Sequence, residues 1–128
     1  MSGRHHSRPT GADEDRECQD IRETLSRIGD KWSVHVIGSL IEGPMRYNRL
    51  RRAVSGISQR MLTLTLRLLE RDGLVKRDVL HTAPPTVEYQ LTALGETLIE
   101  PIRALSHWAR EYRHEIRDAR SSFDSRSG

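Results

Sequence analysis

Arginine side chains crowd one stretch of this 128-residue chain. Between Arg46 and Arg77 there are nine basic residues and only two acidic ones, Glu70 and Asp72. The nine are Arg46, Arg49, Arg51, Arg52, Arg60, Arg67, Arg71, Lys76 and Arg77. Guanidinium groups pair with phosphates and with the edges of guanine bases. The stretch therefore predicts a surface that binds nucleic acid, although most charge runs are only solvated helical faces. The whole chain has a formal net charge of only +3, so the remaining residues are acidic on balance.

A single cysteine, Cys18, is the one candidate for thiol chemistry. One thiol excludes an intramolecular disulfide and a cluster of cysteine metal ligands. Arg16 and Arg22 favour a reactive thiolate at this position, whereas Glu14 and the neighbouring acids oppose it. Cys18 is therefore either a sensor of oxidants or electrophiles, or a small inert residue buried between two copies of the chain.

Three polar residues near the C-terminus, His107, Glu111 and His114, have the spacing of one helix face. Paired across a dimer they form a candidate zinc site, but such residues on an exposed helix are usually only solvated. We expect no metal and no cofactor. An enzyme with Cys18 as its nucleophile would need His35 or His107 as the base, and no oxyanion loop accompanies either. The sequence thus favours a protein that is not an enzyme, and it leaves the role of His35 open.

The patterned part of the chain lies between two stretches without periodicity. Residues 1–17 predict a disordered arm and residues 121–128 a flexible tail, which leaves 18–120 as a single domain. No apolar run approaches the roughly 20 residues that cross a bilayer, and the N-terminal residues lack the apolar core of a secretory signal. We therefore expect a cytoplasmic protein that contacts no membrane.

Four helices are predicted in the first half of this domain. Their apolar rows are Ile21, Leu25 and Ile28; Trp32, Val36, Ile37, Leu40 and Ile41; Tyr47, Leu50 and Val54; and Leu62, Leu66 and Leu69. Asp30 and Ser58 are placed to cap the second and the fourth helix. Gly29, Gly43 and Gly56 end the first three helices.

The hydrophobic period then changes from helical to alternating. Residues 75–80 and 87–91 alternate as strands do, and the sequence Ala83-Pro84-Pro85 between them suits a hairpin tip. A last long helix begins after Thr92 and extends toward Arg117, with a kink or break at Pro101. This order predicts a mainly α fold with a small β-hairpin wing, a winged helix-turn-helix.

The fourth predicted helix is the recognition helix of such a fold. With its leucines turned inward, its outward residues are Ser58, Gln59, Arg60, Thr63 and Arg67. Gln59 matches adenine, Arg60 and Arg67 match guanine, and Thr63 matches either a phosphate or a thymine methyl group. Leu64 belongs either to a second core row or to an apolar base contact, and we favour packing in the core or in a dimer.

Seven short motifs follow one another between about residue 18 and residue 108. They are Gly29-Asp30-Lys31-Trp32, Gly43-Pro44-Met45-Arg46-Tyr47, Leu50-Arg51-Arg52, Gly56-Ile57-Ser58-Gln59-Arg60-Met61-Leu62, Leu69-Glu70-Arg71-Asp72-Gly73-Leu74-Val75, Pro84-Pro85-Thr86-Val87-Glu88-Tyr89 and Leu91-Thr92-Ala93-Leu94-Gly95. Together they resemble the HxlR-type family of bacterial winged helix-turn-helix transcription regulators.

The resemblance implies a homodimer that binds double-stranded DNA at a palindromic operator and is nucleoid-associated when bound. Its first and last helices would form the dimer interface, and its wing would reach the minor groove. Apolar rows at both ends of the chain also need a partner, because one small winged-helix core cannot cover them. In some members of the family a lone cysteine near the start senses quinones, aldehydes or oxidants, which implies that role for Cys18.

The predicted contacts with DNA combine the basic stretch, the recognition helix and the wing. Thr86 stands where similar proteins often carry a basic residue after the paired prolines, so His81 and Arg77 are candidates to replace it. The predicted DNA-binding residues are Arg46, Arg49, Arg51, Arg52, Ser58, Gln59, Arg60, Thr63, Arg67, Arg77, His81 and Thr86. Two alternatives stay open: the same fold regulated by a metal or small ligand, and a winged helix that binds proteins without binding DNA.

Overall fold

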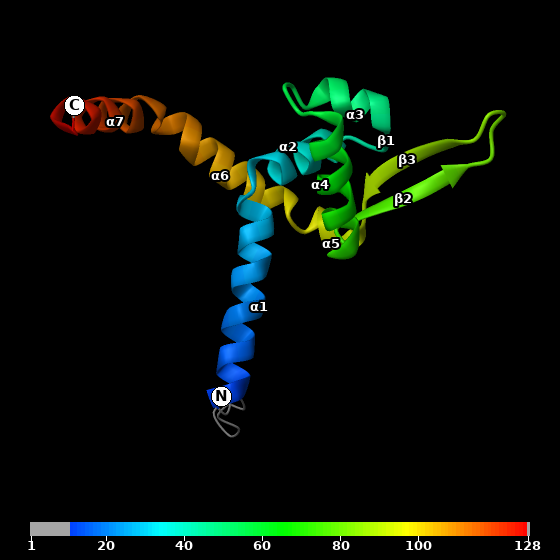
Figure 1. The fold of residues 1–128 in the computed structure, drawn as a ribbon, viewed down its shortest axis with the longest axis horizontal. Helices are drawn as coiled ribbons and strands as arrows, with labels where there is room; N and C mark the ends of the chain where they lie inside the picture. The colour runs from blue at the N-terminus through cyan, green and yellow to red at the C-terminus, as the bar shows by residue number, and fades with distance from the viewer. Residues whose placement is uncertain (1–10, 128) are drawn as a thin grey trace.

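The computed structural model describes residues 11–127, as helices around a three-stranded sheet. The elements are α1 (Gly11–Gly29), α2 (Lys31–Leu40), β1 (Met45–Arg46), α3 (Tyr47–Ala53), α4 (Gln59–Arg71), β2 (Val75–Leu80), β3 (Thr86–Leu91), α5 (Ala93–Glu96), α6 (Ile99–Glu111) and α7 (Arg113–Ser127). Helices α2 to α5 and the base of the sheet form a body from which α1, the β2–β3 hairpin and α6–α7 project in different directions (Figure 1). The predicted mainly α fold with a hairpin wing is confirmed.

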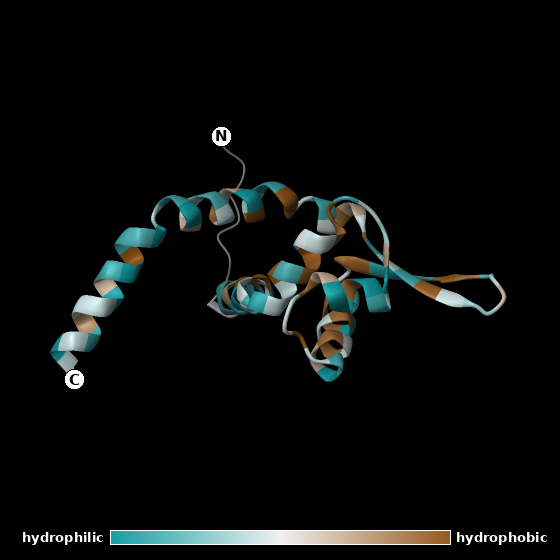
Figure 2. Cartoon of the chain, turned by 90° about the horizontal axis from the view of Figure 1, so that it is seen from above, coloured by the Kyte–Doolittle hydropathy of each residue, from teal (hydrophilic) through white to brown (hydrophobic). Residues whose placement is uncertain are grey.

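The hydrophobic core is built around one face of α4. Leu62, Leu66 and Leu69 of that helix are buried against Val36 and Ile37 of α2. The other buried apolar residues are Leu40, Leu50, Val54, Ile57, Leu74, Val75, Leu91 and Ile102. In Figure 2 the hydrophobic residues gather where the helices and the base of the wing meet, whereas the C-terminal helix is mostly hydrophilic.

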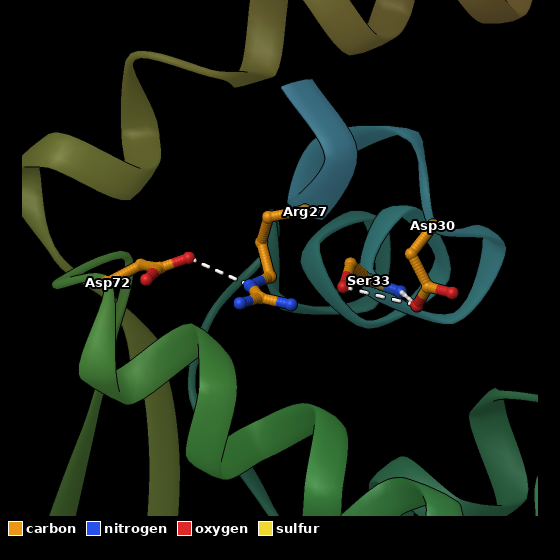
Figure 3. Close-up of polar contacts among 4 residues, drawn as sticks. All are labelled: Arg27, Asp30, Ser33 and Asp72. Carbon is orange, nitrogen blue, oxygen red and sulfur yellow. Dashed lines mark hydrogen bonds and ion pairs between the residues drawn. The ribbon is translucent and has the colours of Figure 1, made fainter. Parts of the chain in front are cut away.

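Side-chain caps begin the helices where the sequence places them. The Asp30 carboxylate accepts a hydrogen bond from the backbone N–H of Ser33 at 3.1 Å and another from its hydroxyl at 3.3 Å (Figure 3). The Ser58 hydroxyl accepts one from the N–H of Met61 at 3.0 Å. Each cap satisfies a donor that the first turn of a helix cannot satisfy by itself, so α2 and α4 have defined starting points.

The wing is a hairpin extended by a third strand. Strands β2 and β3 pair in antiparallel fashion from Val75 opposite Leu91 to Leu80 opposite Thr86. The two-residue strand β1 pairs with the other edge of β3, with Met45 opposite Tyr89. The sequence did not predict β1, because two residues are too few to show an alternating pattern. This strand fixes the start of α3 against the wing.

A hydrogen-bonded junction ties the end of α4 to the end of the wing. The Thr92 hydroxyl donates to the carbonyl oxygen of Gly73 at 2.6 Å and accepts from the N–H of Gly95 at 3.0 Å. The Thr92 N–H donates to the carbonyl oxygen of Leu74 at 3.1 Å. Gly73 turns the chain out of α4 with a φ of 77°, in the left-handed region that favours glycine. This junction gives a physical reason for the Leu91-Thr92-Ala93-Leu94-Gly95 motif.

The two ends of the chain depart from the predicted boundaries. Residues 11–17, predicted as part of a disordered arm, form the first turns of α1, where Asp13 and Glu14 interact favourably with the helix dipole. Residues 1–10 of that arm lie outside the described residues. Residues 121–127, predicted as a flexible tail, belong to α7. An apolar row of Ile116, Ala119 and Phe123, not recognised in the sequence, gives this helix one apolar face.

Two predictions within the domain also need correction. The single long last helix is divided into α5, α6 and α7. The first break is the one predicted at Pro101, but it comes just before that residue, which lies in the first turn of α6, where its missing N–H is not needed. The second break, at Tyr112, has no sequence signal. Leu64 is 48% exposed and lies outside the core, because α4 already buries its opposite face. Its placement in a second core row is therefore wrong, whereas its packing in a dimer stays a prediction. Among the helices of residues 11–127, none is long and apolar enough to span a membrane.

We predict that Gly95→Ala lowers the free energy of unfolding by about 3 kcal/mol. A Cβ on Gly95 would overlap the backbone carbonyl oxygen of Leu74 and push α5 away from the junction. Gly38→Ala is the matched control, because no atom lies within 4 Å of a Cβ at that helical position. It should stabilise the protein by about 0.5–1 kcal/mol. Urea unfolding followed by circular dichroism measures both, and equal stabilities of the two variants would contradict the prediction.

Candidate nucleic-acid interface

The face of α4 opposite the core carries the predicted recognition residues. Arg60, Thr63 and Arg67 are exposed along this face, at spacings of three and four residues. Leu64 lies on it as well, four residues after Arg60 and three before Arg67. We call these four residues the outer row of α4. Ser58 and Gln59, also exposed, precede the row at the start of the helix.

Tyr47 fixes the start of α4 relative to α3. Its hydroxyl donates a hydrogen bond to the backbone carbonyl oxygen of Gln59 at 2.9 Å. The Thr63 hydroxyl lies 2.9 Å from the same phenol oxygen. The first residue of α3 thus bonds the first and second turns of α4. Sequence reasoning placed Tyr47 in an apolar row and missed this role, because a tyrosine at helical spacing gives no sign of where its hydroxyl will point.

A second group of predicted residues lines a groove between α3, β1 and β3. The groove has a volume of about 540 Å³ and is lined in part by Arg46, Arg49, Arg52 and Thr86. Glu88 lies in the same lining and is the strand partner of Arg46, so one carboxylate partly offsets the three guanidinium groups. Residues about 40 positions apart in the sequence meet here because β1 pairs with β3.

The remaining predicted contacts are more widely spread. Arg51 is exposed on α3 and does not line the groove. Arg77 lies on β2 opposite Tyr89, and His81 follows the end of β2 in the hairpin tip. In Figure 1 that tip lies away from the helices, at the end of the projecting wing. Apart from Arg51, the predicted residues therefore form an α4 group, a groove group and a wing group.

The basic side chains of this stretch form no ion pairs among the described residues. Within residues 11–127, none of the nine basic side chains between Arg46 and Arg77 forms an ion pair with another described residue. Their guanidinium and ammonium groups are exposed and keep their hydrogen-bond donors for a ligand. Such an arrangement suits an anionic partner that brings many acceptors at once.

One ion pair connects α1 to the far end of α4. The Arg27 Nε atom lies 2.8 Å from a carboxylate oxygen of Asp72, the residue that caps the C-terminus of α4 (Figure 3). Both side chains are partly exposed, so the pair contributes less than about 1 kcal/mol to stability. Its structural effect is to join a projecting helix to the predicted recognition helix, a link that no local sequence pattern indicates.

Cys18 belongs to none of these groups. It is exposed on α1, which projects from the body (Figure 1). On this helix it shares a face with Ile21, Leu25 and Ile28, at spacings of three, seven and ten residues. The thiol therefore lies in line with the apolar residues that lead into the body of the protein.

The histidines do not assemble a metal site in the described part of the chain. His107 and Glu111 lie 3.6 Å apart on α6, while His114 follows the break at Tyr112 and contacts Arg113. Residues 11–127 contain no group of three or more His, Cys, Asp or Glu side chains arranged to hold a metal ion. His35 is exposed on α2 beside Trp32, with 6.4 Å between the ring centroids.

Comparison with known proteins places this arrangement among helix-turn-helix regulators. The transcriptional regulator YdeP of Bacillus subtilis is 43% identical over 103 residues, which cover 80% of each chain. The reduced form of the redox regulator HypR is 41% identical with a TM-score of 0.72, over 77% of this chain and 98% of HypR. The reduced form of the transcriptional regulator YodB from B. subtilis is 31% identical with a TM-score of 0.66, over 73% of this chain and 91% of YodB.

A family model covers most of the folded region described above. The model of the HxlR-like helix-turn-helix matches residues 27–117, from the last turn of α1 to the first part of α7. That range contains the core, the outer row of α4, the groove and the wing. The chain therefore belongs to the family of HxlR-like helix-turn-helix proteins.

Proposed function

We propose that this protein is a homodimeric transcriptional regulator that binds a palindromic DNA operator through α4, the groove and the wing. The observation that carries the proposal is the outer row of α4, which is exposed, basic and free of ion pairs within the described residues. An α-helix with such a face fits the major groove, where arginine reads guanine and apolar groups contact the thymine methyl.

The groove and the wing supply contacts of a different kind. The groove beside the helix-turn-helix is lined by Arg46, Arg49 and Arg52, which suit phosphates better than base edges. Thr86 lines the same groove, while Arg77 and His81 lie along the wing and suit the neighbouring backbone or minor groove. Contacts of this kind set the orientation of the protein on the duplex and contribute affinity for any sequence.

The dimer is supported by apolar residues of α1 and α6 that lie outside the core and are exposed in the single chain. On α6 the face that is buried at Ile102 continues outward through Leu105 and Trp108, which are 62% and 54% exposed. On α1 the row through Ile21 and Leu25 is also exposed. Exposed apolar surface of this extent marks an interaction site, and a second copy, which presents the same rows, would bury them symmetrically.

A redox response through Cys18 is supported by its position and by the relatives. The thiol lies in the exposed row of α1 that the proposed dimer buries. Solved structures of similar proteins include HypR in an oxidized form and YodB after diamide treatment. Because each chain has one cysteine, a protein disulfide here needs one thiol from each of two copies. Its formation would release two protons and two electrons to the oxidant.

The first prediction from this proposal tests the DNA interface. Arg60→Ala and Arg67→Ala should each weaken binding to the operator by about 1–3 kcal/mol and leave binding to unrelated duplexes nearly unchanged. Arg51→Ala and Arg52→Ala should weaken both by similar factors, because phosphate contacts do not depend on sequence. Fluorescence anisotropy at several salt concentrations measures these affinities. Unchanged affinity in all four variants would show that the DNA-binding face lies elsewhere.

The second prediction tests the dimer. Leu105→Glu should convert the protein to a monomer in sedimentation velocity experiments, because a buried interface does not tolerate an unpaired carboxylate. Arg110→Glu, on the opposite side of α6, also adds a carboxylate and should leave the dimer intact. A monomeric wild-type protein, or a Leu105→Glu variant that still sediments as a dimer, would refute this interface.

The third prediction concerns oxidation. Diamide should change the operator affinity of the wild-type protein and produce a dimer band on a non-reducing denaturing gel. Cys18→Ser should show neither effect, and dithiothreitol should reverse both in the wild type. An identical response of the two proteins to diamide would remove Cys18 from the mechanism, while leaving the DNA interface untouched.

A further inference from the structure

We propose that Thr63 and Leu64 together recognise the C5 methyl group of a thymine in the operator. The hydrogen bond between Thr63 and Tyr47 occupies the hydroxyl of Thr63 and leaves its methyl group for this contact. The inference rests on the proposed function, because it assumes that the outer row of α4 enters the major groove. It goes beyond that function by naming the base and the chemical group that part of the row would read.

The donors and acceptors around Tyr47 determine what Thr63 can offer. The Tyr47 hydroxyl has one proton, and the carbonyl oxygen of Gln59, 2.9 Å away, can only accept. That proton therefore points at Gln59. The Thr63 hydroxyl, 2.9 Å from the phenol oxygen, must then be the donor in its own hydrogen bond to Tyr47. The one proton of the Thr63 hydroxyl is therefore engaged in a hydrogen bond to Tyr47.

This assignment decides between the two contacts that the sequence allows for Thr63. A phosphate oxygen carries no proton, so a threonine can bind it only by donating one. Thr63 has no proton left to donate, whereas its exposed side chain also carries a methyl group, which suits an apolar contact. Ser58 is the contrasting case, because its oxygen accepts from the N–H of Met61 and its own proton is not engaged by any residue of the described chain. Ser58, rather than Thr63, is suited to a phosphate.

Leu64 provides an independent reason to expect an apolar contact. It is 48% exposed on a helix face whose neighbours in the row are Arg60 and Arg67. An exposed leucine between two arginines gains nothing from water or from a phosphate. The thymine methyl is the apolar group that the major groove presents. Thr63 and Leu64 are consecutive residues whose side chains leave the helix about 100° apart, so they can flank a single methyl group or contact two on neighbouring bases.

The experiment replaces thymine by uracil, one position at a time, in an operator recovered by selecting genomic fragments with the full-length protein. Uracil lacks only the C5 methyl group and keeps the pairing of thymine. At one or two thymines in each half-site, the replacement should weaken wild-type binding by roughly fourfold, the effect of losing one buried methyl contact. At the other thymines it should change little.

Three variants assign this effect to the two side chains. Leu64→Ala and Thr63→Ser each remove methyl groups, and each should bind the thymine and uracil operators with more nearly equal affinity. Thr63→Val loses the hydroxyl but keeps a methyl group, so it should retain the preference for thymine. If Thr63 instead donated to a phosphate, the order would be reversed: Thr63→Val would weaken binding to every duplex, and Thr63→Ser would behave as wild type.

Two controls separate the possible failures. Binding to an unrelated duplex should be nearly the same for all three variants, and Leu64→Ala and Thr63→Ser should unfold at nearly the wild-type temperature, because both positions are exposed and serine keeps the hydroxyl that bonds Tyr47. Thr63→Val loses that hydrogen bond, which costs about 1 kcal/mol of stability. Operator binding without sensitivity to uracil at any thymine would overturn the inference and leave the proposed function intact. A wild-type protein that selects no DNA would overturn the proposed function itself.

Discussion

The burial of one face of α4 is the constraint on which the rest of the structure depends. Leu62, Leu66 and Leu69 are nearly inaccessible to solvent against α2. Because the helix has a single apolar face, burying it forces Arg60 and Arg67 to the outside. The core and the candidate interface are thus two sides of one helix. Leu64 is the exception, an apolar residue on the outer side that the core does not bury and that the proposed thymine contact would use.

Hydrogen bonds then fix α4 at both of its ends. Ser58 and Tyr47 hold the first two turns, and Thr92 holds the chain just beyond the last turn at Gly73. A reading helix has to keep its angle to the neighbouring helix and wing within narrow limits if several side chains are to meet base edges together. Each individual bond contributes only about 1 kcal/mol to stability. Their common effect is to fix the position of α4 relative to α3 and the wing.

The projecting helices have a different energetic character. The body buries its own apolar residues, whereas α1 and α6 carry exposed rows that gain nothing in a monomer. Covering them with a second copy would stabilise the fold and fix the spacing of two α4 helices in the same step. Arg27 bridges the two parts of the molecule, because it extends from α1 to the C-terminal cap of α4. A change at Cys18 would begin on this same helix.

The sequence by itself determined the order of the main helices and of the hairpin, the inward row of α4, the caps at Asp30 and Ser58 and the family, because these depend on local periodicity and on short motifs. It also placed nine basic residues on the helix-turn-helix and the start of the wing.

Only the tertiary structure decided what depends on distant pairing. Strand β1 exists because β3 is there to bond it, and the groove with Arg46 and Thr86 follows from that pairing. The proton of Thr63 is assigned only once Tyr47, 16 residues earlier, lies beside it. Periodicity shows which side of a helix is buried, but the partner of a polar atom is settled by the fold.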